Sequence, residues 1–217
     1  MTINAPDELG GAVIPDAGDL RTGSLGVVRF DERPPTAWKN GQGSTREIAR
    51  RLLGVVGPDF VWRISVAEMT QNADFSSFPG VERVMVLVRG DGLTIEVAGE
   101  QHRLQPFTPF AFDGEADSHA LLADGPVQVL NVMTRSSRMS ANVTVHDLSD
   151  GRPISIAGPT VAVLLSGSAR AVATDGASAT LGVHDALIPK QHVRSVAGSG
   201  LLAVVRMENF RVWRWNS

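Results

Sequence analysis

The chain has 217 residues, 43% of them apolar, with a net charge of −3 at neutral pH and a pI near 5.9. Lysine and arginine do not gather into a stripe, so neither nucleic acid nor an anionic membrane surface is an expected partner, and a small molecule is favoured. Cysteine is absent, which excludes disulfides, thiol catalysis and cysteine-ligated metal sites.

Residues 1–23 are predicted to form a flexible N-terminal tail. This acidic segment contains proline and glycine and is unlike a signal peptide. No apolar run in the chain approaches the roughly 20 residues of a membrane-spanning helix. We therefore expect a cytoplasmic protein.

The segment 38–47 crowds an indole, two glycines and several hydrogen-bonding side chains into ten residues. Among them, Asn40, Thr45 and Glu47 supply donors and acceptors, so the segment can hold a ligand. A purely structural interpretation is equally open. Asn40 and Gly41 fit a hairpin turn, and Ser44 with Glu47 fits a helix capping box.

Short β-branched runs alternate with Gly, Pro, Asp and Ser along the rest of the chain. Their spacing is typical of an all-β sandwich or barrel. The predicted strands are 27–30, 60–67, 84–88, 93–97, 127–133, 161–165 and 201–207.

Two stretches of the chain match each other at an offset of 77 positions. Residues 84–90 align with residues 161–167, and Gly99 and Leu104 align with Gly176 and Leu181. The match predicts a small antiparallel barrel made twice, at residues 24–135 and 136–217. Polar residues concentrate in the first copy, so the ligand pocket is expected there and a mainly structural role in the second.

Alternation in the strand 60–67 sends Arg63 and Ser65 to one face and the larger apolar residues to the other. An arginine inside a barrel must be paired, because an isolated buried charge costs several kcal/mol. Glu47, Asn40 and Ser65 can satisfy it in part, and an anionic ligand can complete its partners. The alternative is a solvated arginine on an edge face.

The loop before the strand 84–88 is rich in aromatic residues. Phe75 and Phe78 can wall a pocket, and Arg83 can support an anion site. Pro79-Gly80 by itself fits a type II turn with a positive φ at the glycine. Further along the chain, Asn131 interrupts an apolar row and is either a ligand contact or a core amide bonded to backbone.

The sequence contains little that indicates a metal site or a catalytic nucleophile. The five histidines, His102, His119, His146, His184 and His192, form no ligand-spaced pair with a nearby carboxylate, so no metal and no cofactor are predicted. No Gly-x-Ser-x-Gly elbow is present, and the glycines near Ser44 lack the lysine of a phosphate loop.

Several ordered motifs resemble the HutD/Ves family of bicupins. They are Trp38-Lys39-Asn40-Gly41-x-Gly43-x-Thr45-Arg46-Glu47-Ile48, Trp62-Arg63-x-Ser65-x-Ala67, Phe75-Ser76-x-Phe78-Pro79-Gly80-x-x-Arg83, Gly125-Pro126-Val127 and Asn131-Val132-Met133. The resemblance implies a tandem cupin without the usual metal-binding histidines. It also implies an accessory role in bacterial histidine utilisation, a pocket for N-formylglutamate or a related acid, and a strand rather than a helix at 45–49. Gln42, Val129 and the segment 72–74 depart from the family pattern, which leaves the exact ligand open.

We expect a binding protein for a small carboxylate, with no catalytic residue. Arg63 is the predicted main anion contact and Arg83 supports it. The remaining predicted ligand-binding residues are Asn40, Thr45, Glu47, Ser65, Ser76, Phe78 and Asn131. The alternatives are a metal-free cupin enzyme, an isomerase or acyl-amino-acid hydrolase with Glu47 as general base, and a protein-interaction surface. A homodimer is possible.

Overall fold

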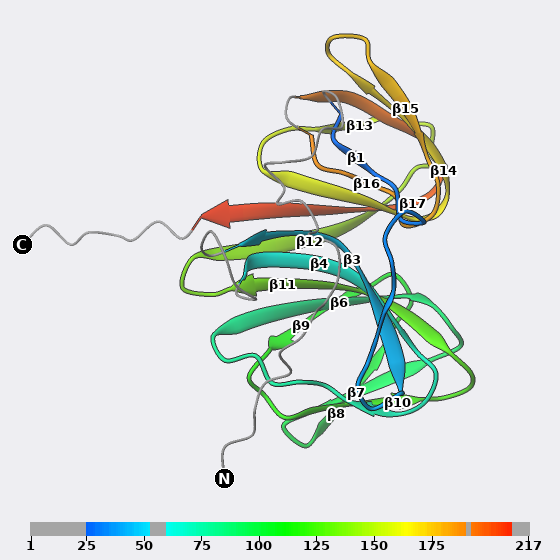
Figure 1. Cartoon of the computed structure of the whole chain (residues 1–217). Coiled ribbons are helices and arrows are strands. Elements are labelled where there is room, and N and C mark those ends of the chain that lie inside the picture. Colours follow the sequence, from blue (N-terminus) through cyan, green and yellow to red (C-terminus); the bar gives the residue numbers. More distant parts are fainter. Residues whose placement is uncertain (1–24, 53–59, 190–191, 210–217) are drawn as a thin grey trace, which may run out of the picture.

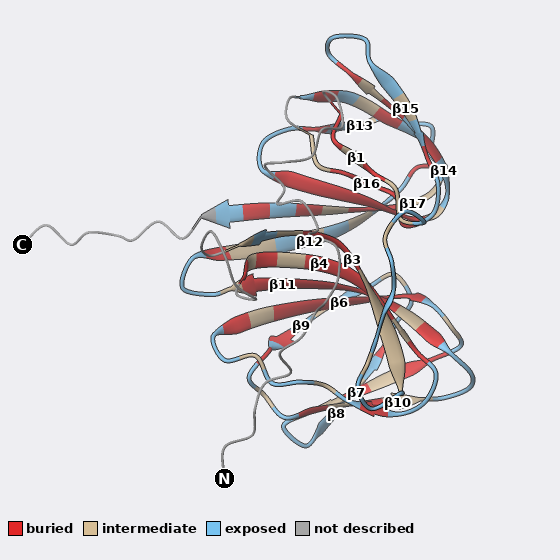
Figure 2. Cartoon of the chain, viewed as in Figure 1, coloured by how far each residue is buried: buried red, intermediate tan, exposed pale blue. Residues whose placement is uncertain are grey.

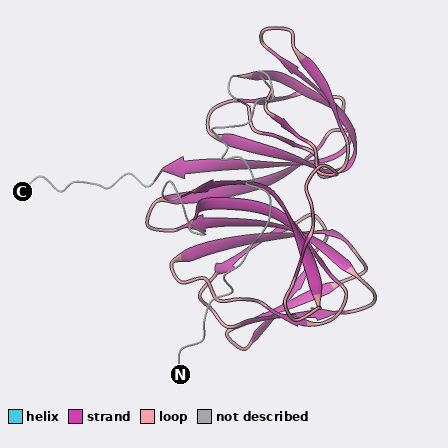
Figure 3. Ribbon diagram, viewed as in Figure 1, coloured by secondary structure: helices cyan, strands magenta, loops and turns pink. Residues whose placement is uncertain are grey.

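The computed structural model describes residues 25–52, 60–189 and 192–209, and every regular element in these ranges is a β-strand (Figure 3). The all-β prediction is confirmed, and each of the seven predicted runs contains a strand. The predicted tail, residues 1–23, lies outside the described residues. Within the described ranges there is no helix long and apolar enough to cross a membrane.

The first barrel packs a six-stranded sheet against a four-stranded sheet (Figure 1). In pairing order, the larger sheet consists of β2 (Thr36–Ala37), β3 (Gly43–Leu52), β4 (Phe60–Met69), β11 (Val127–Arg135), β6 (Val81–Arg89) and β9 (Pro109–Asp113). The smaller sheet consists of β5 (Ala73–Asp74), β10 (Ser118–Leu122), β7 (Leu93–Val97) and β8 (Glu100–Leu104).

The second barrel is a single seven-stranded sheet. Its main path runs through β1 (Val27–Val28), β16 (Ala186–Leu187), β14 (Thr160–Ala173), β17 (Val193–Asn209) and β12 (Met139–Asp147). Off this path, β13 (Ile154–Ile156) pairs with β17, and β15 (Ser178–Leu181) pairs with β14. The long strands β14 and β17 pair with each other, and each also pairs with two shorter strands. Gly167 and Gly200 face each other where the pair bends, and a Cβ on either would meet the partner's backbone.

The predicted repeat is present in the strand order. At the offset of 77 positions, β4-β11-β6-β9 of the first barrel corresponds to β12-β17-β14-β16 of the second. The aligned Gly99 and Gly176 both adopt left-handed conformations, with φ of 84° and 86°. The aligned Leu104 and Leu181 are both buried. The chain therefore folds as a tandem barrel.

The division into barrels at residues 24–135 and 136–217 stays a prediction. Strand pairing departs from this division at the first strand. β1 pairs antiparallel with β16, with Val27 opposite Leu187 and Val28 opposite Ala186. By hydrogen bonding, this early strand belongs to the second barrel (Figure 1).

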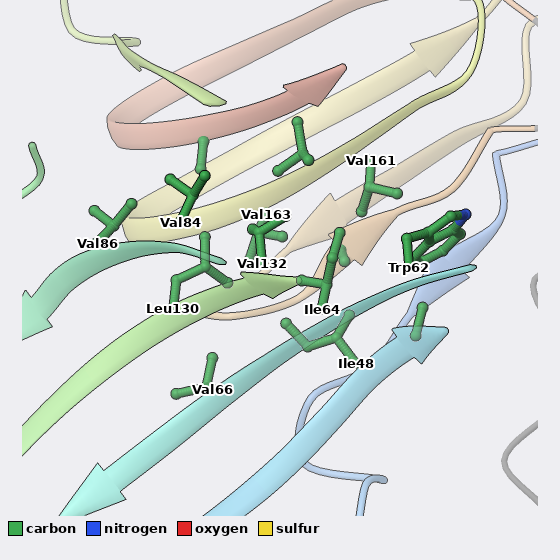
Figure 4. Close-up of a cluster of buried hydrophobic side chains, with 14 of the residues drawn as sticks. Ile48, Trp62, Ile64, Val66, Val84, Val86, Leu130, Val132, Val161 and Val163 are labelled. Carbon is green, nitrogen blue, oxygen red and sulfur yellow. The ribbon is translucent and has the colours of Figure 1, made fainter. Parts of the chain in front are cut away.

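The two barrels meet through an apolar cluster between the six-stranded sheet of the first barrel and the sheet of the second (Figure 4). The first barrel contributes Ile48, Trp62, Ile64, Val66, Val84, Val86, Leu130 and Val132, and the second contributes Val161, Val163, Leu165, Ala203 and Val205. The inner strands are buried while the outer turns are exposed (Figure 2). Since this junction uses one face of each strand, the opposite face must line the interior of its barrel.

Truncation of Ile64, which is fully buried in this junction, should weaken the whole molecule. We expect Ile64→Ala to lower the free energy of unfolding by about 2–5 kcal/mol, since it removes buried methyl groups and leaves a cavity. Urea unfolding followed by tryptophan fluorescence measures the loss. Val183→Ala, at an exposed valine, is the control and should change stability by less than about 0.5 kcal/mol. Equal effects of the two substitutions would contradict the packing at the junction.

Candidate functional site

The polar residues of the first barrel lie in two neighbouring rows across its larger sheet. Strand register places Glu47, Ser65 and Asn131 side by side in one row, on β3, β4 and β11. The adjacent row contains Arg50, Arg63, Met133, Arg83 and Phe112, on β3, β4, β11, β6 and β9. These positions alternate with the apolar residues of the barrel junction, so both rows face the barrel interior.

Glu47 is the centre of the charged network. Its Oε2 accepts a hydrogen bond from Nε of Arg63 at 2.7 Å. Its Oε1 lies 3.4 Å from Nε of Arg50. Arg63, the predicted main anion contact, is therefore inside the barrel mouth as expected, and a protein carboxylate already engages it.

Arg83 is the most deeply buried cation of the network, with 3% of its surface exposed. Its guanidinium lies 4.7 Å from the ring centroid of Phe75, 5.1 Å from that of Phe112 and 6.0 Å from that of Phe78. Burial, and secondarily the charge of Arg63, lowers the pKa of Arg83 to about 10. Cation–π contacts offset part of this desolvation, but they give the N–H groups no acceptor.

Several polar atoms of the network are buried without a hydrogen-bond partner in the described structure. The donors are Nε of Arg50 and Nε and Nη1 of Arg83, and the acceptors are Oε1 of Glu47 and Oδ1 of Asn131. Within the described residues, Glu47 is the one carboxylate within 4.0 Å of any of the three arginines. Arg50 and Arg63 share this single anion, and Arg83 has no carboxylate within 4.0 Å among the described residues, so the site carries excess positive charge.

Thr45 and Asn40 have structural partners. Oγ1 of Thr45 accepts a hydrogen bond from Nε1 of Trp38 at 2.8 Å, and the indole closes over Gly43, where a Cβ would meet the ring. Oδ1 of Asn40 accepts from the backbone N–H of Gln42 at 3.1 Å. Asn40 thus stabilises the turn before β3, as the structural interpretation of this segment predicted.

The other predicted residues divide between the interior and the loop. Ser65 and Asn131 are buried neighbours in the first polar row. Phe78 lies beside Arg83, on a loop whose backbone is held by the bond from the N–H of Phe78 to the carbonyl of Gly114 at 2.7 Å. Ser76 is exposed and is not brought to the network. Residues 45–49 lie within strand β3, so the strand expectation is confirmed and the capped helix is wrong.

Sequence reasoning missed Arg50 and Phe112. A β-bulge between Glu47 and Ala49 sends both Ile48 and Ala49 to the barrel junction and returns Arg50 to the interior. Simple alternation from Glu47 would have placed Arg50 outside. Phe112 had a usable signal, because Phe110 and Phe112 alternate as inward residues after a proline.

No metal-ligating cluster is found in the part of the chain that the structure describes, where no three or more His, Cys, Asp or Glu side chains are placed to hold an ion. The five histidines lie apart. His119 is near Asp74 and Asp117, and His192 lies 2.6 Å from Oγ of Ser155. None of the five takes part in the charged network of Arg50, Arg63 and Arg83.

Comparison with known proteins identifies the family. The HutD family model matches residues 30–202. The chain belongs to the HutD family. Protein Ves of Citrobacter koseri is 42% identical over 122 residues, which are 54% of this chain and 63% of that relative's length. The chain thus spans less than two thirds of the length of that relative.

Solved structures agree with the fold. HutD from Pseudomonas fluorescens SBW25 (formate condition) is 29% identical, with a TM-score of 0.71 over 84% of this chain and 97% of that one. A cupin 2 conserved barrel domain protein from Leptotrichia buccalis has a TM-score of 0.54 over 84% of this chain and 96% of that one, at 9% identity. The second likeness concerns the fold alone, and together they support a cupin-like fold.

Removing the buried charge of Arg83 should stabilise the unliganded protein. We expect Arg83→Met to raise the free energy of unfolding near neutral pH by about 1–3 kcal/mol, because methionine fills similar space without the desolvation cost. The lowered pKa sets the pH dependence. The folded state loses the Arg83 proton above pH about 10, before the unfolded state does, so the advantage of the variant should shrink as pH rises through that value.

Chemical denaturation of both proteins between neutral and alkaline pH measures this difference. Arg103→Met, at an exposed arginine of β8, is the matched control and should show neither the gain nor its pH dependence. A variant less stable than the wild type at neutral pH would show that the aromatic contacts outweigh the desolvation of Arg83.

Proposed function

We propose that the protein binds a small dicarboxylate that carries an N–H group, of the N-formylglutamate type, in its first barrel. One observation supports the proposal: Arg83 is buried with two N–H groups unpartnered, and the carboxylate of Glu47 is already engaged by Arg50 and Arg63. Two carboxylates on a ligand would balance the excess charge. In this proposal the protein is a cytoplasmic accessory factor of histidine utilisation, which its membership of the HutD family supports.

The positions of the arginines suit a ligand with two acidic groups. Arg63 and Arg83 are on opposite sides of Met133, two strand spacings apart, so their Cα atoms are about 10 Å from each other. Guanidiniums that converge from this distance can each hold one carboxylate of a short diacid. Arg83 replaces Arg63 as the main contact, because Glu47 already neutralises Arg63.

Unpartnered acceptors supply the second element of recognition. Oδ1 of Asn131 and Oε1 of Glu47 face the same interior and need a donor. An amide N–H between the two carboxylates of the ligand provides one. A diacid without this donor would leave a buried acceptor unsatisfied, which costs about 1–3 kcal/mol.

Binding requires a local opening of the aromatic cover. Arg83 is enclosed by Phe75 and Phe78 from the loop before β6 and by Phe112 from β9. Of the three, Phe75 and Phe78 are only partly buried. We propose that these two rings move aside when the ligand enters.

Calorimetry with N-formylglutamate tests the proposal. Two or three charge-assisted bonds, less the costs of association, predict a dissociation constant of about micromolar to millimolar. Glutarate, which has both acids and no N–H, should bind more weakly, and the uncharged diamide should not bind. Arg83→Met should lower the affinity for N-formylglutamate by at least about tenfold, whereas the exposed control Arg103→Met should leave it unchanged. No heat with N-formylglutamate or glutarate, or wild-type affinity in Arg83→Met, would refute the site.

The rival function is catalysis with Glu47 as the base. Since Glu47 is engaged by Arg63 and faces Arg50, its geometry favours an electrostatic role. Mass spectrometry of the ligand after prolonged incubation separates the two functions. A binder returns N-formylglutamate unchanged, and turnover that is lost in Glu47→Gln would favour the enzyme.

A further inference from the structure

A cavity of about 530 Å³ lies across the junction of the two barrels, away from the arginine network. We call it the inter-barrel cleft. It is lined by Phe30, Asp31, Val88, Arg89, Gln128, Leu165, Ser166, Gly167, Val183 and His184. The first barrel supplies the end of β6 and the start of β11, and the second supplies β14 and the turn before β16.

The walls of the cleft come from equivalent positions of the repeat. At the offset of 77 positions, Val88 and Arg89 correspond to Leu165 and Ser166. The cleft therefore forms where equivalent positions of the two copies, at the end of β6 and in the middle of β14, come together. Each copy contributes an apolar residue followed by a polar one.

His184 has a left-handed backbone that the repeat explains. Its φ is 67°, and the equivalent Phe107 has a φ of 58°. The N–H of His184 donates to the carbonyl of Leu164, and that of Phe107 donates to the carbonyl of Leu87, which is again equivalent. The conformation belongs to the fold. An imidazole is not required for it, since phenylalanine occupies the same position in the first copy.

The imidazole of His184 has capacity left for a ligand. The residue is 94% buried, since its exposed fraction is 6%, and its ring packs edge-on against Phe30 at 4.8 Å. Within the described residues its ring makes no hydrogen bond, although it lines the cleft. Burial lowers the pKa of His184, and so does the charge of Arg89, while Asp185 and Asp31 act in the opposite sense. A neutral imidazole offers one donor and one acceptor.

Two opposite charges flank this imidazole without pairing to each other. Arg89 and Asp31 both line the cleft, and both act electrostatically on His184. Neither has an ion-pair partner within 4.0 Å among residues 25–52, 60–189 and 192–209. Asp185, by contrast, is fully engaged by Arg29 and by the backbone N–H groups of Phe30 and Gly182.

The rest of the cleft combines a hydroxyl donor with an apolar wall. Oγ of Ser166 accepts from the N–H of Leu201 at 3.1 Å, which leaves its hydroxyl hydrogen for another partner. Val88, Leu165 and the exposed Val183 provide apolar surface beside these polar groups. A ligand that fits must therefore carry both charges and an apolar part.

We propose that the inter-barrel cleft binds a free α-amino acid with an apolar or aromatic side chain. Arg89 holds the carboxylate, Asp31 holds the ammonium group, and the imidazole of His184 bonds to one of the two. The side chain of the ligand packs against Val88 and Leu165. This site is separate from the arginine network and does not depend on the proposed binding of a diacid there.

NMR of the histidine Cε1–H signals tests the proposal. The signal of His184 is identified by its absence in His184→Phe, a substitution that the phenylalanine at the equivalent position 107 shows to be compatible with the backbone. Millimolar leucine or phenylalanine should shift this signal. Phenylpropionate, which lacks the ammonium group, and phenethylamine, which lacks the carboxylate, should bind at least about tenfold more weakly. No shift with either amino acid, or equal binding of all four compounds, would overturn the proposal.

Charge variants supply the controls. Arg89→Gln and Asp31→Asn should each lower the affinity for phenylalanine by about tenfold or more and leave the melting temperature of the protein unchanged. Arg103→Gln, which removes an exposed charge outside the cleft, should leave the affinity unchanged. Arg83→Met should weaken N-formylglutamate binding and leave phenylalanine binding intact, so that failure of one site is distinguishable from failure of the other. Wild-type affinity in both Arg89→Gln and Asp31→Asn would refute the assignment.

Discussion

The packing of one barrel against the other constrains everything else in this molecule. The inner strands of the first barrel give their most apolar face to that junction, where Ile64 and Val132 are almost completely buried. Successive residues of a strand point to opposite sides. The alternate positions on these strands, which include Arg63, Arg83 and Asn131, therefore point into the barrel. Their inward orientation follows from the apolar residues of the barrel junction beside them.

That arrangement gives the first barrel an interior of two kinds. One region is filled by residues such as Met69, Met85 and Ile95, and the other holds the arginine network. Buried positive charge in the second region opposes folding, so an anion bound there, as we propose, would stabilise the folded state. The second barrel, whose interior is lined by residues such as Leu164 and Val196, supplies apolar surface without such a cost.

Alternation and composition were sufficient to predict the all-β class, the repeat and most of the interior polar set, because period-two patterns record which face is buried. They did not reveal the bulge after Glu47, since two consecutive apolar residues such as Ile48 and Ala49 also fit a regular strand that is buried on both faces, and so Arg50 was missed. They also selected Asn40 and Ser76, whose side chains lie away from the arginine network in this structure. A polar side chain in a conspicuous motif can serve a turn or solvent equally well, and only its partners distinguish the two. The pairing of Glu47 with Arg63, which is the reason we propose Arg83 as the main anion contact, depends on side-chain positions that no sequence pattern encodes.

The strand formed by Val27 and Val28 ties the beginning of the described chain to one of its latest elements. During synthesis, β1 cannot pair until Ala186 and Leu187 of β16 have been made. The second barrel therefore closes only after most of the described chain has been synthesised. Excision of that barrel as an independent fragment would leave β16 with an open hydrogen-bonding edge, prone to association with other strands. The pairing of β1 with β16 therefore links the two barrels into one folding unit. Their repeated architecture alone would have suggested two separable domains.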